Sequence, residues 1–364
     1  MLTERRMRRA RQLIALAVSC FAVHAGAQTA AAPQHDFGRT PNVISIGYGV
    51  LATPMSVLGE VMRRDQILAR AATQQKLEFR FHPFEKGVDA LPPLLEGKLD
   101  GAMPTDVVAL DAIAHSEIVL LGYVRQSFSS VVGQRGSSMA ELKGKRIGNA
   151  QGTSGHNTLL QGLAGVGLSE KDVTLVQMNV RDMQDALLTG KIDAFAAWEP
   201  TPSMTLRQHP ARFSALHKQI SPAYLVVSRQ MSRENPEAAR LLVASLHRAV
   251  RWLKNNRGNL DTASRWTRVA MFTFTGKTPA VSDKEIAALT RSDLLNIAGA
   301  PLIPANEGES NSALWRSFEF FRKAGKLPAD MSWATVQSSF DAEHTAHVIA
   351  NARRYKLDEF DYAP

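Results

Sequence analysis

The spacing of apolar residues predicts an ordered series of strands and helices over the first third of the chain. Short β-branched or alternating runs over residues 43–46, 77–82 and 99–103 have the period of strands. Apolar residues at helical spacing occupy residues 54–72 and 88–95 between them. The order β-α-β-α-β predicts an α/β fold with a parallel sheet.

The same order recurs later in the chain. The segment Leu94-Leu95-Glu96-Gly97-Lys98-Leu99-Asp100 matches Leu187-Leu188-Thr189-Gly190-Lys191-Ile192-Asp193, and each reads as a helix end, a glycine stop and a strand start. In both copies a strand, a turn and a helix precede the match; in the second these are residues 146–150, 151–155 and 157–166. We therefore expect two α/β lobes of similar plan.

Four loops follow the predicted strands, at residues 48–51, 104–106, 151–156 and 198–201. Ligands bind at the carboxyl ends of strands in open α/β sheets, so these loops are the candidate binding elements. The third loop, Gln151-Gly152-Thr153-Ser154-Gly155-His156, has the glycines and the helix start of an anion site. An ordinary capped helix start accounts for the same residues equally well.

The N-terminus has the pattern of an export signal. Five arginines precede an apolar run at residues 13–23, and Ala25-Gly26-Ala27 forms a small-x-small cleavage site. We expect residues 1–27 to be removed and residues 28–41 to be a flexible tether. A buried first helix, twin-arginine export and lipidation at Cys20 are the alternatives.

Composition and charge narrow the function classes. The chain has 364 residues, of which 45% are hydrophobic and 21% charged, which excludes disorder, collagen and coiled coil. The net charge of +9 falls to about +5 when the arginine-rich signal is removed, so it gives no reason to expect nucleic acid as a partner. The single cysteine, Cys20, lies within the signal, so the exported protein would contain no disulfide and no cysteine nucleophile.

Several motifs together resemble one protein family. They are Glu141-Leu142-Lys143-Gly144-Lys145-Arg146-Ile147-Gly148, Gly152-Thr153-Ser154-Gly155-His156, Gly167-Leu168, Ala186-Leu187-Leu188-Thr189-Gly190-Lys191-Ile192-Asp193-Ala194 and Trp198-Glu199-Pro200. They are similar to motifs of the periplasmic solute-binding proteins of the nitrate, sulfonate, taurine and thiamine-pyrimidine ABC transporter group. The similarity extends over about residues 42 to 300.

The resemblance implies a two-lobed type II periplasmic binding protein fold with an interlobe ligand cleft. Lobe one would comprise residues 42–131 and 225–364, and lobe two residues 132–224. The family implies a monomer in the periplasm, without a cofactor, that delivers a small molecule to an ABC transporter permease in the inner membrane.

Carried over by position, the resemblance assigns the ligand-binding residues Tyr48, Gly49, Val50, Leu51, Thr105, Ser154, Gly155, His156, Trp198 and Glu199. Trp198 would supply an apolar wall, and Glu199 could accept a hydrogen bond from a ligand amine or hydroxyl. Asp106 departs from the pattern, because Asp106 and Glu199 facing one cleft would repel a bare oxyanion such as nitrate. The expected ligand is a larger, sulfonate-like organic anion or a zwitterion.

Enzymatic functions are the competing interpretations. Gly47-x-Gly49-x-x-Ala52 after a strand imitates a dinucleotide fingerprint and would indicate an exported nicotinamide oxidoreductase, although export removes the protein from its cofactor supply. Gly152-Thr153-Ser154-Gly155 is not the nucleophile elbow of a serine hydrolase. His344 and His347 could hold a metal, but we expect two solvated histidines on a surface helix. We therefore predict a receptor that is not an enzyme and binds no metal.

Overall fold

The computed structural model describes residues 42–115 and 117–364 of the chain. The predicted signal peptide, the predicted tether and Cys20 lie outside these described residues. Within them, no helix is both long enough and apolar enough to cross a membrane.

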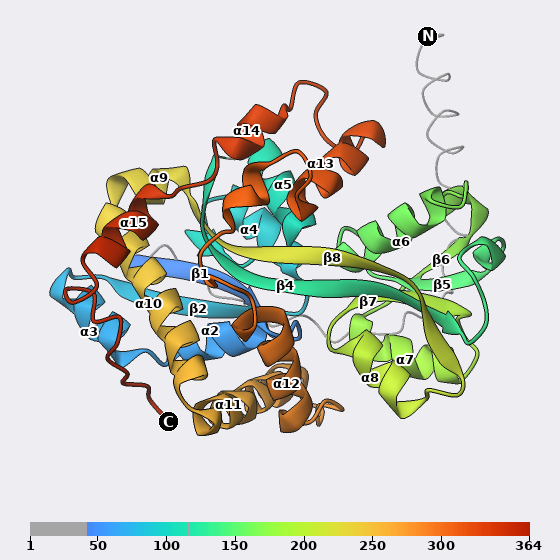
Figure 1. Ribbon diagram of the computed structural model, residues 1–364, viewed down its shortest axis with the longest axis horizontal. Helices are drawn as coiled ribbons and strands as arrows, with labels where there is room; N and C mark the ends of the chain where they lie inside the picture. The colour runs from blue at the N-terminus through green and yellow to red at the C-terminus, as the bar shows by residue number, and fades with distance from the viewer. Residues whose placement is uncertain (1–41, 116) are drawn as a thin grey trace, which may run out of the picture. The chain divides into compact units, whose positions relative to one another are not determined.

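The described strands form one eight-stranded sheet in the order β2-β1-β3-β8-β4-β7-β5-β6 (Figure 1). They are β1 (Val43–Gly49), β2 (Glu78–Phe84), β3 (Gly101–Ala102), β4 (Ile118–Gln134), β5 (Arg146–Asn149), β6 (Thr174–Gln177), β7 (Ala194–Trp198) and β8 (Phe213–Ser228). β1 pairs in parallel with β2 and β3, and β5 pairs in parallel with β6 and β7. The predicted α/β class, with its repeated parallel unit, is thereby confirmed.

Strands β4 and β8 join the two halves of the sheet. They pair antiparallel from Ile118 opposite Ser228 to Gln134 opposite Phe213. β3 adds to β8 at one end of this ribbon, and β7 adds to β4 at the other. The ribbon therefore supplies the two crossing segments that a two-lobed fold requires, while the exact limits of the lobes stay a prediction.

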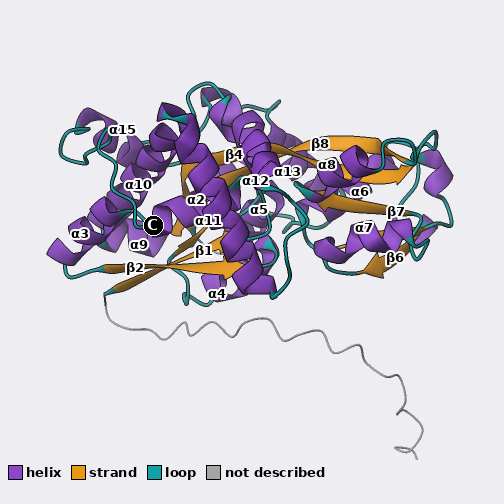
Figure 2. Cartoon of the chain, turned by 90° about the horizontal axis from the view of Figure 1, so that it is seen from below, coloured by secondary structure: helices purple, strands orange, loops and turns teal. Residues whose placement is uncertain are grey.

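Helices lie on both faces of the sheet. They are α2 (Met55–Arg63), α3 (Gln66–Gln74), α4 (Leu91–Leu95), α5 (Asp106–His115), α6 (Ser154–Ala164), α7 (Val180–Leu188), α8 (Thr201–Gln208), α9 (Arg229–Glu234), α10 (Pro236–Asn255), α11 (Arg257–Thr275), α12 (Asp283–Thr290), α13 (Ala313–Lys323), α14 (Trp333–Gln337) and α15 (Glu343–Ala350). Figures 1 and 2 show α2 on one side of β1 and α4 on the other. The strands between them are consequently buried on both faces, as parallel strands usually are.

The helix expected over residues 54–72 is two helices. Asp65 interrupts the periodic run, because its Oδ1 accepts hydrogen bonds of 3.0 Å from the backbone amides of Ile67 and Leu68 and so caps the start of α3. The next expected helix, over residues 88–95, is a 3₁₀ turn (Gly87–Ala90) followed by α4, which is short and begins with prolines in its first turn.

The strand expected over residues 99–103 is reduced to Gly101–Ala102. A Cβ at Gly101 would lie 2.5 Å from the Val226 carbonyl oxygen, so glycine is required for β3 to approach β8. The repeated heptapeptide is confirmed as a structural repeat. Gly97 and Gly190 both adopt the left-handed conformation, with φ of 65° and 69°, directly after a helix.

Candidate functional site

The loop after β1 contacts the loop after β7, although β1 and β7 lie on opposite sides of the β4–β8 ribbon in the sheet order. The backbone amide of Thr53 donates to the carbonyl oxygen of Glu199 at 3.4 Å. Nearby, a Cβ at Gly152 would lie 3.3 Å from a methyl carbon of Val88, so the loop after β5 also packs against the first half of the chain. The loop after β1 therefore contacts the loop after β7, and the loop after β5 contacts the 3₁₀ turn that follows β2.

Arg125 contacts the loop after β1. It lies on β4, its side chain is fully buried, and its Nη1 donates to the Thr53 carbonyl oxygen at 3.1 Å. Its Nε and Nη2 have no hydrogen-bond partner among the described residues. Burial lowers the pKa of Arg125, and the nearby carboxylates of Asp293, Asp106 and Glu199 oppose that shift. Because an arginine in a protein remains charged, these two nitrogens carry three N–H donors without an acceptor among the described residues.

Other buried polar atoms without a partner occur at the ends of β5 and β7 and in the segment that follows β1. They are both amide atoms of Asn149 at the end of β5, Trp198 Nε1 at the end of β7, Thr53 Oγ1 and, in the first turn of α2, Ser56 Oγ. Most buried polar groups in native proteins are hydrogen-bonded, so such a concentration requires an explanation. A polar ligand bound at this point would supply the missing partners.

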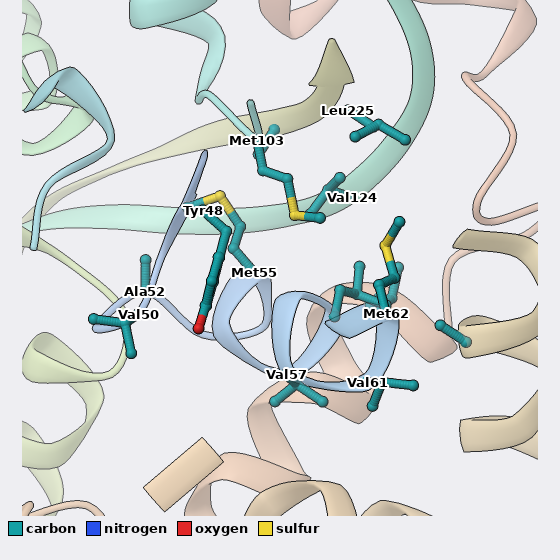
Figure 3. Packing of buried hydrophobic residues seen from close by; sticks show 14 of the residues in the cluster. Tyr48, Val50, Ala52, Met55, Val57, Val61, Met62, Met103, Val124 and Leu225 are labelled. Carbon is teal, nitrogen blue, oxygen red and sulfur yellow. The ribbon is translucent and has the colours of Figure 1, made fainter. Parts of the chain in front are cut away.

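The side chains of Tyr48 and Val50 are committed to the core of the first half. Figure 3 shows the Tyr48 ring beside α2, and Gly59 makes this approach possible, because a Cβ there would lie 2.3 Å from the ring. The Tyr48 hydroxyl donates to Glu60 Oε1 at 2.5 Å. Val50 is fully buried in the same apolar cluster. Only the backbone of the predicted loop, with Gly49, is left to face a ligand at these positions.

Leu51 lies beside the contact between the loops after β1 and β7. It is half-buried and lines a cavity of about 270 Å³ together with Pro200, Thr201, Met204 and Met271. The cavity lies between the loop after β1, the start of α8 and the end of α11. It opens beside the loops that carry Thr53 and Glu199.

The helix start at α6 uses most of its own polar groups. Thr153 Oγ1 accepts from the His156 amide at 3.4 Å, and His156 Nδ1 accepts from the Gly152 amide at 3.3 Å. Ser129 Oγ donates to Ser154 Oγ at 3.0 Å. A Cβ at Gly155 would lie 2.7 Å from the Ala196 carbonyl oxygen, so this glycine lets α6 pack closely on β7. These contacts favour the capped-helix interpretation of the motif.

Thr105 and Asp106 lie beside β8. Thr105 is buried and forms an isolated bridge to Ala223 of β8. Asp106 is fully buried, and its two oxygens accept from Ser221 Oγ at 2.9 Å and Ser317 Oγ at 2.6 Å. Burial raises the pKa of Asp106 to about 6, against the lowering effect of the two serine hydroxyls. Asp106 is thus held by protein groups and is less repulsive than a bare carboxylate.

Trp198 and Glu199 are the predicted residues at the contact between the loops after β1 and β7. Trp198 is the last residue of β7, is 4% exposed and has a free indole N–H. Both oxygens of Glu199 accept from Ser203, from its amide at 3.2 Å and its hydroxyl at 2.8 Å. Burial raises the pKa of Glu199 despite these two hydrogen bonds.

Sequence reasoning missed Arg125, Thr53, Ser56 and Asn149. Arg125 had a detectable signal, because it is the one charged residue in the strand-forming run of residues 118–134. Thr53 and Ser56 lie where turn and helix-cap residues are ordinary, and Asn149 lies at the end of a short predicted strand, so their types carry no comparable signal.

The structure also shows the surroundings of the dinucleotide-like motif and of His344. Gly47 of the dinucleotide-like motif serves packing, because a Cβ there would lie 3.0 Å from the Phe84 ring and 3.1 Å from Leu99. His344, expected to be solvated, is buried, and its Nε2 lies 2.9 Å from Ser232 Oγ. Over residues 42–115 and 117–364, no three histidine, cysteine, aspartate or glutamate side chains are grouped to hold a metal ion.

Comparison with known proteins identifies the family. A family model described as NMT1/THI5 like matches residues 76–258, which is half of the chain. The chain belongs to this family. One relative of this NMT1/THI5-like chain, a Brucella abortus (strain 2308) protein named only as a binding protein, is 27% identical over 237 residues, covering 58% of this chain and 70% of the relative.

Solved structures show the fold of this NMT1/THI5-like protein. The alkanesulfonate-binding protein SsuA from Xanthomonas axonopodis pv. citri, bound to MOPS, superposes with a TM-score of 0.60 at 19% identity and covers 83% of this chain and 98% of its own. The periplasmic nitrate-binding protein NrtA from Synechocystis PCC 6803 gives a TM-score of 0.59 at 13% identity and covers 85% and 89%. The fold is that of the periplasmic binding proteins, as the sequence motifs predicted.

Proposed function

We propose that this chain is an exported solute-binding protein that captures a small, sulfonate-like organic anion or zwitterion between its two lobes and delivers it to an ABC transporter permease. The observation that carries the proposal is Arg125, a fully buried guanidinium with two unpartnered nitrogens where the lobes meet. A buried cation without a partner is costly, and a bound acid group would compensate it.

The proposed binding mode follows from the free donors. The acid group of the ligand accepts from Nε and Nη2 of Arg125, which form a fork suited to two oxygens of a sulfonate or carboxylate. Trp198 Nε1 and the Asn149 amide offer further hydrogen bonds, and the Trp198 ring forms an apolar wall. The backbone of residues 49–51, Thr105, the start of α6 and Glu199 complete the proposed cleft.

Closure of the lobes is part of the proposal. With lobe one as residues 42–131 and 225–364 and lobe two as residues 132–224, ion pairs connect Glu85 to Arg181 and Glu285 to Arg207 across the cleft. The relatives named for binding and the periplasmic neighbours of the same fold support a periplasmic receptor without covalent chemistry. We infer a monomer that presents its closed, liganded form to the permease.

A thermal-shift panel tests the function. Alkanesulfonates, carboxylates, amino acids, pyrimidines and nitrate are each added to the mature protein at about 100 times the expected dissociation constant, where a ligand specific for the folded state adds about 2.7 kcal/mol of stability. At least one organic acid should raise the melting temperature by a few degrees and be recovered unchanged. Turnover of the stabilising compound, or stabilisation by a nicotinamide dinucleotide alone, would contradict the proposed function as a solute receptor.

A further inference from the structure

A polar residue interrupts the buried apolar face of α13. This face consists of Leu314, Ser317, Phe318 and Phe321, and the side chain of Ser317 is fully buried. A hydroxyl in such a position has to find partners within the protein, because an unpaired buried polar group is costly. α13 lies beyond residues 76–258, which the family model matches, so membership of the family assigns this serine no role.

The Ser317 hydroxyl joins two of the segments that we propose for the ligand cleft. Ser317 Oγ donates to Asp106 Oδ2 at 2.6 Å, and Asp106 directly follows Thr105. The same oxygen accepts from Asn157 Nδ2 at 3.4 Å, and Asn157 directly follows His156 at the start of α6. With the lobe limits proposed above, Asp106 and Ser317 belong to lobe one and Asn157 belongs to lobe two. One hydroxyl therefore connects a binding loop of lobe one to a helix start of lobe two.

Contacts within lobe one hold α13 in place independently of lobe two. Leu314 and Phe318 pack in the same apolar cluster as residues of α5 and β8, and Figure 1 shows α13 beside α5. The other oxygen of Asp106 accepts from Ser221 Oγ on β8 at 2.9 Å. A movement of lobe two relative to lobe one would therefore change the distance from Asn157 to the Ser317 hydroxyl, whereas that hydroxyl would stay with Asp106.

A second contact with lobe two lies just beyond the C-terminal end of α13. Lys326 Nζ lies 3.5 Å from Glu170 Oε1, and the other oxygen of Glu170 lies 3.6 Å from His156 Nε2. The side chains of Lys326 and Glu170 are 35% and 39% exposed, so salt should screen this ion pair. The segment from Ser317 to Lys326 thus contacts lobe two at two places, and both lie beside the start of α6.

We propose that Ser317 is a positioning residue of the ligand site, which together with Lys326 holds the start of α6 against the loop at residues 104–106. Neither side chain has to touch the ligand. Their contacts stabilise the arrangement of the lobes in which both binding segments face one ligand, and so they slow its dissociation. This inference rests on the proposed function and gives α13 and the segment after it a role in that function.

Removal of the hydrogen bond from either lobe tests the inference. Ser317→Ala and Asn157→Ala should each raise the dissociation constant of an organic acid from the thermal-shift panel about threefold or more, mainly through faster dissociation. The double substitution should bind about as well as the weaker single variant, because both changes remove the same contact. Lys326→Ala should raise the dissociation constant about twofold at low salt and by less at high salt. Calorimetric titration measures the affinities, and stopped-flow competition measures the dissociation rates.

Ser245→Ala is the matched control. Ser245 is also fully buried, and its hydroxyl donates to a carboxylate within lobe one, Asp65 Oδ2, at 2.8 Å. Ser245→Ala and Ser317→Ala should both lower the stability of the unliganded protein, because each leaves a buried carboxylate with one donor fewer. Of these two variants, Ser317→Ala alone should also bind the ligand more weakly.

The outcomes separate this inference from the proposed function. If Ser317→Ala lowers stability but not affinity, as Ser245→Ala should, the inference is overturned and the proposed function stands. Effects of Ser317→Ala and Asn157→Ala that multiply in the double variant overturn it as well. Asn157→Ala and Lys326→Ala give the answer if Ser317→Ala fails to fold. If no organic acid of the panel binds wild type, the proposed function fails and the inference fails with it.

Discussion

Arg125 Nη1 donates to the backbone carbonyl oxygen of Thr53 at 3.1 Å and thereby fixes the guanidinium beside the loop that follows β1. This single hydrogen bond orients the fork, while Nε and Nη2 are left free. One edge of the guanidinium thus holds the loop, and the other edge is the one that we propose for the ligand.

Replacement of Arg125 by methionine should mainly weaken ligand binding, whereas the same replacement of Arg248 should mainly lower stability. Arg125→Met should weaken binding of organic acids by about 100-fold, because hydrogen bonds to charged groups contribute about 1.5–3 kcal/mol each. The free energy of unfolding of the unliganded protein should fall less than it does in Arg248→Met, because Arg125 forms no ion pair and burial disfavours its charge. Calorimetric titration and denaturant unfolding measure the two effects.

Arg248→Met is the matched control. Arg248 is also buried, but its Nη2 lies 2.6 Å from Asp65 Oδ2 and its Nη1 donates to the Tyr355 carbonyl oxygen at 2.7 Å. The substitution should cost about 3–5 kcal/mol of stability, because Asp65 is left without its cation. Ligand affinity should be unchanged. A loss of stability without a loss of affinity in Arg125→Met would assign Arg125 a purely structural role.

Trp198→Phe tests the free indole N–H. The substitution keeps an aromatic wall but removes the donor, so affinity should fall about tenfold while the melting temperature of the unliganded protein stays nearly constant. Trp333→Phe is the comparison, because Trp333 Nε1 already donates to the Gly308 carbonyl oxygen at 3.1 Å. It should lower stability and spare affinity. The same result for Trp198→Phe would make Trp198 a core residue.

Asp106→Asn should change the pH dependence of stability. Burial raises the pKa of Asp106 from 3.8 to about 6, so the folded protein retains a proton that the unfolded chain releases between these two values. Wild type should therefore lose up to about 3 kcal/mol relative to Asp106→Asn as the pH rises from about 4 to above 6. Denaturant unfolding of both proteins at pH 4 and pH 7.5 measures this. A difference in stability that does not vary with pH contradicts the assignment.

Arg207→Gln tests whether ion pairs across the cleft stabilise the closed form. Arg207 on α8 pairs with Glu285 on α12 at 2.6 Å, and the pair is partly exposed. Its loss should weaken ligand binding by about two- to fivefold at low salt and by less at high salt. Arg322→Gln breaks a pair with Glu319 inside one helix and should not affect affinity. If both substitutions weaken ligand binding equally, stabilisation of the closed form is not the cause of the weakening.

The sequence predicted the elements whose signals are local. The parallel unit of β1, β2 and β3 was found from apolar spacing, and its repeat from the glycine stops at Gly97 and Gly190. The continuous ribbon of β4 and β8 could not be found in this way, because its pairing joins residues about a hundred positions apart. Asp65, a polar residue inside an apolar period, was the overlooked signal for the break between α2 and α3.

The site was predicted as loops, but its chemistry was only partly foreseen. Glu199, which the motif selected, contacts the loop after β1 through its backbone, and Trp198 beside it is buried; their role in binding stays a prediction. Tyr48 and Val50 turn into the core because strand residues alternate between faces, and the loop alone does not decide which face. Asp293 had no signal at all, since its hydrogen bond with Ser127 of β4 joins residues 166 positions apart in the sequence.

The crystal structure of the mature protein with an organic acid selected from the thermal-shift panel tests the central claim most directly. The account predicts that the acid group lies within hydrogen-bond distance of Nε and Nη2 of Arg125, with Trp198 against the ligand. A ligand bound elsewhere, for example in the apolar pocket of about 520 Å³ between Leu302 and Ile349, with Arg125 still unpartnered, would contradict it.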